Sequence, residues 1–210
     1  MDIRDIHWLG HDSFRLDGST TIYIDPWKLP PDPPAADGVL VTHDHYDHLS
    51  AEDIELIARP QTVIIGPEAV AKKLEQDTAI VVTAGETFQC ASALVTAVPA
   101  YNVDKFRKPG VPYHPKEAGY LGYVVELDGF RVYHSGDTDV LADVECDVAL
   151  IPVSGTFVMT ADEAVDACQR LRAKTIVPMH YADIVGTEAD ALRLKERCGK
   201  DVVILPLERG

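Results

Sequence analysis

The chain has 210 residues, of which 46% are hydrophobic and 25% charged, the balance of a globular protein. Its 34 acidic against 19 basic residues give a net charge of −15, which repels phosphate backbones and argues against a nucleic-acid partner. The sequence has neither an apolar stretch of about 18 residues nor an apolar run at its start, so we expect no membrane span and no secretory segment. We therefore expect a cytoplasmic protein of one domain over residues 1–210.

Strands and helices alternate in the first half of the predicted structure. Residues 20–24 are β-branched and aromatic, and 39–41 form a short apolar strand that leads into His43. Ser50 and Asp53 have the spacing of a capping box, which predicts a helix to about residue 58. The further expected elements are strands at 62–65, 79–82 and 94–98 and a helix at 67–74.

The second half repeats this alternation. Asp128-Gly129 between the apolar runs 120–127 and 130–134 predicts a hairpin. Further predicted elements are strands at 148–151, 175–177 and 202–205, a helix from a capping box at Thr160 to about 171, and a helix at 188–198 ended by Gly199. Two strand-rich halves with helices predict an α/β (α+β) class in which two sheets face each other with helices outside.

The run His43-Asp44-His45-Tyr46-Asp47-His48 is the strongest chemical signal in the sequence. Side chains at i and i+2 of an extended segment point to the same side, so His43 and His45 can bind one metal ion. A turn at Asp47 and His48 can then present a second carboxylate–imidazole pair. Neutral imidazole suits zinc. Three histidines in one hexamer predict a metal centre rather than a histidine-rich loop.

Two later positions also follow predicted strands. Asp137 comes after Gly136, which would allow a close backbone approach, and His180 follows the strand 175–177. Each signal is weak alone, because an aspartate after glycine is often a turn and a single histidine is often a hydrogen-bonding residue. Their shared placement at strand ends makes both candidate ligands.

The pattern H-x-H-x-D-H after a short strand resembles the signature of the metallo-β-lactamase fold hydrolases. Asp25 resembles the first acidic motif of that superfamily, usually structural, and Asp137 resembles the aspartate that bridges two metal ions. His180 resembles its last histidine ligand. The resemblance covers Gly10 to about Tyr181 and implies a four-layer αββα sandwich. The motifs around Trp8, the Asp25–Trp27 turn and residues 177–181 are similar to the branch related to L-ascorbate-6-phosphate lactonase.

One expected ligand of that superfamily is missing from its usual place. Tyr101 stands where a third histidine for the first metal site is expected. His114 is the nearest candidate to replace that histidine. It has three interpretations: a metal ligand, a substrate-binding residue or a surface histidine. His11 is either an orienting partner of the ligands or a polar core residue, and His7 is expected to be structural.

These features predict a hydrolase with two divalent metal ions, zinc before manganese or iron, and a hydroxide shared by both ions. We expect ligands at His43, His45, Asp47, His48, Asp137 and His180, with Asp47 also orienting the hydroxide. The substrate is expected to be a small ester, lactone or phosphodiester. The basic loop at 102–119 either attracts an anionic substrate or is mere surface charge.

Two alternatives remain open at this stage. One is a metallo-nuclease, which the acidic charge disfavours. The other is a non-hydrolytic metal-binding protein or iron oxidoreductase. Iron enzymes of this superfamily often replace a histidine of the second site with an acid, whereas His48 is present here.

Overall fold

The computed structural model describes residues 1–74 and 79–209. The strands are β1 Ile6–Gly10, β2 Ser13–Asp17, β3 Thr21–Ile24, β4 Gly38–Leu40, β5 Val63–Gly66, β6 Ile80–Val81, β7 Thr87–Cys90, β8 Ala93–Pro99, β9 Phe106–Lys108, β10 Val111–Pro112, β11 Leu121–Leu127, β12 Phe130–His134, β13 Glu145–Pro152, β14 Arg172–Met179 and β15 Asp201–Val202. The helices are α1 Ala51–Ile57, α2 Glu68–Lys73, α3 Ala161–Arg170 and α4 Glu188–Arg197, with 3-10 turns at Ile3–Asp5 and Lys116–Ala118.

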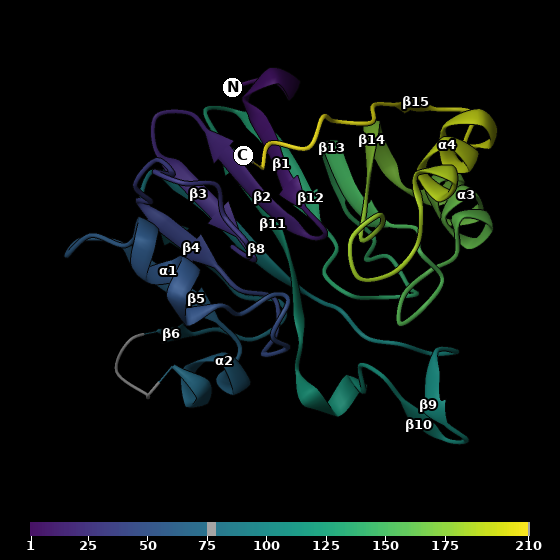
Figure 1. The fold of residues 1–210 in the computed structure, drawn as a ribbon, viewed down its shortest axis with the longest axis horizontal. Coiled ribbons are helices and arrows are strands. Elements are labelled where there is room, and N and C mark those ends of the chain that lie inside the picture. The colour runs from purple at the N-terminus through teal and green to yellow at the C-terminus, as the bar shows by residue number, and fades with distance from the viewer. Residues whose placement is uncertain (75–78, 210) are drawn as a thin grey trace.

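Two mixed sheets form the centre of the molecule (Figure 1). The first has the order β1-β2-β3-β4-β5-β6, and the second has the order β15-β14-β13-β12-β11-β8-β7. In the second sheet β12, β13, β14 and β15 are parallel, so their carboxyl ends meet at one edge. A separate two-stranded hairpin, β9-β10, projects from the sandwich (Figure 1).

The two sheets share one hydrophobic core. Buried side chains from the first sheet, such as Phe14 and Ile24, belong to the same cluster as Tyr123 and Val125 of the second. The Tyr123 hydroxyl donates to the Val41 carbonyl at 2.8 Å and so joins the sheets by a buried hydrogen bond. This facing arrangement confirms the predicted fold class, because apolar faces of two sheets bury each other.

Helices cover the outer faces. A second cluster, which includes Val39, Ile54, Ile57 and Val70, packs α1 and α2 on the outside of the first sheet. Helices α3 and α4 contact β13, β14 and β15 of the second sheet. Among the described residues, no helix combines the length and apolar character needed to cross a membrane. The prediction of one domain over 1–210 stays a prediction, which the shared core supports.

Several local signals hold and two need correction. The Asp128-Gly129 turn has φ values of +52° and +74°, as a type I′ hairpin requires, and the Thr160 capping box forms with Glu163. At Ser50 only half of the box forms, because the Asp53 carboxylate instead accepts the Lys28 and Leu29 backbone amides. The final strand ends at Val202 rather than 205.

Candidate metal centre

The histidine hexamer lies between β4 and α1. His43 follows the strand directly, and His45 begins a turn in which the amides of His48 and Leu49 both bond to its carbonyl. Ser50 then caps α1. The turn brings all three imidazoles together, with the ring centroid of His43 4.5 Å from that of His45 and 3.9 Å from that of His48.

Three more segments bring side chains to the same place. Asp137 follows β12, His180 follows β14, and His11 with Asp12 forms the turn between β1 and β2. His180 donates its backbone amide to the His11 carbonyl at 3.1 Å, which joins two of these segments. Parallel strands in the second sheet thus deliver Asp137 and His180 to one edge, against the hexamer.

Three imidazoles form the first group of potential ligands: His43, His45 and His114. The Nε2 of His43 lies 3.0 Å from Nδ1 of His45, and Nε2 of His114 lies 3.3 Å from that same atom. His114 Nε2 is also 3.3 Å from Oδ2 of Asp137. His114, from the loop before β11, thus lies at the third position of this group, as one of its three interpretations from the sequence predicted.

The second group gathers around His48 and His180. Oδ1 of Asp137 is 3.6 Å from His48 Nε2, and its Oδ2 is 3.3 Å from His180 Nε2. Oδ2 of Asp47 lies 3.8 Å from His48 Nε2 and 3.2 Å from His11 Nε2. Asp137 therefore faces both groups, which is the position that a residue bridging two ions requires.

Hydrogen bonds set which ring nitrogen of each histidine faces the centre. The Thr42 hydroxyl donates its proton to Asp25 at 2.6 Å. His43 Nδ1 therefore donates to that hydroxyl, and His43 Nε2 carries no proton in the neutral ring. His48 Nδ1 donates to Asp25 at 2.8 Å. His114 Nδ1 donates to Oδ1 of Asn102 at 2.9 Å. In the neutral form of each ring, Nε2 carries no proton and can bind a metal ion. Burial lowers the pKa of His48, but the Asp137 and Asp25 carboxylates raise it well above its ordinary value, so a bound cation would replace the Nε2 proton of this residue.

The backbone around the centre is held in rare conformations. His11, Asp25 and His180 all have positive φ, at +51°, +47° and +58°. Gly136 has φ +62°, and a Cβ there would meet the Leu121 carbonyl oxygen at 2.5 Å, so the approach of Asp137 requires glycine. Such strain persists only where surrounding packing enforces it, and it is typical of functional sites.

The two histidine groups differ in charge. Burial lowers the pKa of His43 well below its ordinary value and lowers that of His114 to about 4, so both are neutral at pH 7. Burial acts the same way on His180, but the Asp137 carboxylate opposes it and raises that pKa to about 9. Burial raises the pKa of Asp47, but the His11 hydrogen bond together with the nearby His48 imidazole lowers it to about 2. The neutral imidazoles of the first group and the ionised carboxylates suit a cation, whereas His180 would give up a proton when a cation binds beside Asp137.

Unsatisfied atoms show that these residues fit a metal ion. Nε2 of His48, Nε2 of His180 and Oδ1 of Asp137 are buried and have no hydrogen-bond partner. A buried polar atom without a partner is costly, and here three of them point at one another. A cation among them would satisfy all three.

Comparison with known proteins agrees with this geometry. Residues 5–180 match the family described as the beta-lactamase superfamily domain. The chain belongs to this superfamily. Relatives described as UPF0173 metal-dependent hydrolases include proteins from Thermococcus onnurineus, 30% identical, and Archaeoglobus fulgidus, 32% identical, each over 98% of this chain and 96% of the relative. The protein is thus a metal-dependent hydrolase of this fold.

Two solved structures have the same fold as this chain. One described as a candidate metal-dependent hydrolase from Parabacteroides distasonis has a TM-score of 0.80 and 32% identity, over 97% of this chain and 93% of that one. CmlA, a diiron β-hydroxylase from Streptomyces venezuelae, has a TM-score of 0.71 but 16% identity, over 96% of this chain and 52% of that one. The second likeness concerns the fold alone.

A cavity of about 360 Å³ opens onto the metal centre of the hydrolase. Its wall combines polar groups of the centre with apolar and aromatic side chains and one cation: His45, Tyr46, Asp47, Arg107, Tyr113, His114, Asp137, Phe157 and Ile184. Arg107 lies on the β9-β10 hairpin. Of the other basic residues of that loop, Lys105 pairs with Asp104 and Glu163, Lys116 lies over the Tyr101 ring, and Lys108 is exposed.

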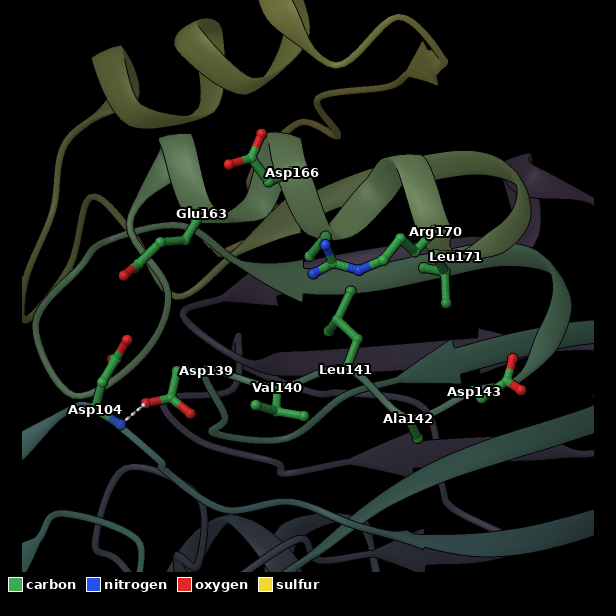
Figure 2. Close-up of a pocket in the computed structure, with 11 residues that line it drawn as sticks. Asp104, Asp139, Val140, Leu141, Ala142, Asp143, Glu163, Asp166, Arg170 and Leu171 are labelled. Carbon is green, nitrogen blue, oxygen red and sulfur yellow. Dashed lines mark hydrogen bonds between the residues drawn. The ribbon is translucent and has the colours of Figure 1, made fainter.

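A larger hollow of about 540 Å³ lies between α3 and the segment after Asp137 (Figure 2). Asp139 at its edge accepts the backbone amides of Val103, Asp104 and Lys105. Histidine and cysteine are absent from the described residues that line it. Through these hydrogen bonds, Asp139 holds the start of the loop that carries Arg107 and His114.

The sequence motifs did not identify Asp12 as a residue of the centre. They also assigned no role to His134. Asp12 is fully buried beside His48 and His180, but an aspartate in a β1-β2 turn carries no motif that would reveal it. His134 donates Nε2 to the Asp12 carbonyl and accepts the Gly136 amide at Nδ1, so it braces two segments of the centre. His7 pairs with Asp17 and Glu208, in keeping with the structural role expected for it.

Proposed function

We propose that the hydrolase binds two divalent metal ions and cleaves a small anionic ester, lactone or phosphodiester. The observation that carries this proposal is the position of Asp137, which lies beside the three clustered imidazoles of His43, His45 and His114 and also beside the buried, unpaired Nε2 atoms of His48 and His180. His43, His45 and His114 would hold the first ion, and Asp47, His48 and His180 the second, with Asp137 shared. Zinc is proposed for the imidazole-rich first group.

When bound, the two ions would supply Lewis acidity and lower the pKa of water towards neutrality. The side chains around the ions would orient the water molecule. Asp47 is ionised at neutral pH and accepts a hydrogen bond from His11, whose own pKa is lowered by burial to about 4. The Asp47 carboxylate can therefore accept a hydrogen bond from an attacking water molecule and orient it.

The cavity above the centre supports a small substrate with an apolar part. Tyr113 and Phe157 are in edge-to-face contact, with ring centroids 4.7 Å apart, and form a rigid wall. Arg107 is the one basic residue other than histidine among the described lining residues. It can bind a carboxylate or phosphate group of the substrate. A small substrate, rather than nucleic acid, also agrees with the net charge of −15.

Metal removal tests the proposal directly. We expect the purified protein to contain two equivalents of metal by mass spectrometry and to lose esterase, lactonase or phosphodiesterase activity on dialysis against a chelator. Free metal at 1,000 times its dissociation constant stabilises the folded protein by about 4 kcal/mol per site relative to the unfolded chain. Because a chain of this size changes its melting temperature by roughly 2–4 °C per kcal/mol, we expect chelation to lower it by roughly 8–16 °C per ion.

Readdition of Zn²⁺, Mn²⁺ or Fe²⁺ then identifies the active metal. Recovery with iron alone, together with oxygen consumption, would favour the oxidoreductase alternative that the diiron CmlA represents. A metal content below one equivalent and a melting temperature insensitive to chelator would refute the metal proposal.

Arg107 tests the substrate class. We expect Arg107→Gln to raise KM for anionic esters about tenfold with little change in kcat, because a charge-assisted hydrogen bond contributes about 1.5–3 kcal/mol. The KM for neutral esters should not change. Lys108→Gln is the matched control, since Lys108 is an exposed cation on the same hairpin and is not among the residues lining the cavity. Equal KM changes for both variants would refute a specific role of Arg107.

A further inference from the structure

Asp12 is a buried acid that the proposed ligand set leaves unexplained. It lies in the turn between β1 and β2 and is fully buried. Neither of its carboxylate oxygens has a hydrogen-bond partner among the described residues. An ionised carboxylate buried without a partner is very unfavourable, so this position requires either a proton or a cation.

The atoms around Asp12 are themselves unsatisfied ligands. Its Oδ2 lies 3.5 Å from His48 Nε2 and 3.8 Å from His180 Nε2, too far for good hydrogen bonds. Both of those nitrogens lack partners as well. His11 Nε2, also 3.8 Å away, is instead 3.2 Å from Asp47, so His11 has a partner on that side.

The spacing of these atoms fits one shared ion. Ligands at 2.0–2.1 Å in a tetrahedron lie about 3.3 Å from one another. Asp12 Oδ2, His48 Nε2, His180 Nε2 and the Asp137 oxygens are separated by 3.3 to 3.8 Å in the contacts between the carboxylates and the imidazoles. Atoms of Asp12, His48 and His180 all lie within 4.8 Å of one another, and Asp137 approaches the two imidazoles through its two oxygens, so a cation among them would satisfy the unpaired atoms of all four residues.

The turn that carries Asp12 is fixed in this position. Its carbonyl accepts His134 Nε2 at 2.9 Å, and the preceding His11 carbonyl accepts Trp8 Nε1 at 3.0 Å and the His180 amide at 3.1 Å. Trp8 also stacks on Tyr181 at 4.9 Å between ring centroids. The turn is therefore braced against the segment that supplies His180, as a ligand-bearing turn should be.

We propose that Asp12 is a direct ligand of the second metal ion, together with His48, His180 and Asp137. This inference rests on the proposed two-metal function and adds a carboxylate to the second site. The second site then has three nearby carboxylates, those of Asp12, Asp47 and Asp137, whereas the first group consists of three imidazoles and shares only Asp137.

The test compares metal binding by the full-length wild type and Asp12→Asn, which keeps the shape and removes the charge. Titration calorimetry with Zn²⁺ and absorption spectra with Co²⁺ are the readouts. We expect the first equivalent to bind as in the wild type and the second at least about tenfold more weakly, with an altered Co²⁺ spectrum. Asp17→Asn, in β2 and paired with Arg15 and His7, is the control and should retain both equivalents.

A second variant keeps the proposal testable if Asp12→Asn folds poorly. Asp12→Cys loaded with Cd²⁺ should show a thiolate-to-metal charge-transfer band that the wild type, with its four buried cysteines, lacks. Two equivalents bound by a folded Asp12→Asn variant with wild-type affinity and spectrum would overturn the role of Asp12 alone. A wild type that binds fewer than two equivalents would instead overturn the two-metal function.

Discussion

Asp137→Asn is expected to lower kcat/KM by more than about 100-fold and to reduce the bound metal below two equivalents. Loss of an outer partner of a metal site already costs roughly 10–100-fold, and Asp137 faces both ligand groups. Burial opposes the charge of this carboxylate, but the imidazoles of His180 and His48 hold its pKa well below the ordinary value. Asparagine keeps the volume and removes the charge that two cations would share.

The measurement is metal content by mass spectrometry, combined with steady-state kinetics on the most active ester or phosphodiester. Asp147→Asn serves as the control, because Asp147 lies near the start of β13, pairs with Lys174 at 2.6 Å and takes no part in the metal centre. Full metal content and unchanged turnover in Asp137→Asn would contradict the bridging position.

Asp25→Ala is expected to give the largest loss of stability, about 3–5 kcal/mol in the free energy of unfolding. The buried Asp25 carboxylate accepts the Thr42 amide at 2.7 Å, the Thr42 hydroxyl at 2.6 Å and His48 Nδ1 at 2.8 Å. Alanine leaves these donors unpaired in the core and is also disfavoured at φ +47°.

Asp25→Asn separates the loss of the hydrogen bonds from the backbone strain that alanine would add. Asparagine tolerates positive φ, so it tests the carboxylate without adding backbone strain. Its single oxygen cannot accept all three donors, and we expect a smaller loss of stability together with weaker metal binding through misoriented His43 and His48. Chemical unfolding and metal titration measure both. Wild-type stability in Asp25→Ala would show that these hydrogen bonds are not needed.

The features that the sequence predicted correctly depend on neighbouring residues in the chain. The hexamer from His43 to His48 places its side chains by short-range geometry, and Asp128-Gly129 between two apolar runs favours a hairpin. Asp137 and His180 could be chosen as candidates because each follows an apolar strand. The strand-rich halves predicted two facing sheets, and the family resemblance implied the four-layer sandwich, which the structure confirms.

Nonlocal pairing decided the rest. Parallel order in the second sheet, which no single segment encodes, brings Asp137 and His180 to one edge. His114 reaches the first ligand group because Asn102, twelve residues away, accepts both its Nδ1 and its backbone amide. Asp12 becomes a candidate ligand only because the β1-β2 turn packs against His180. A long loop and a two-residue turn have no periodicity, so only the packed structure reveals where their side chains lie.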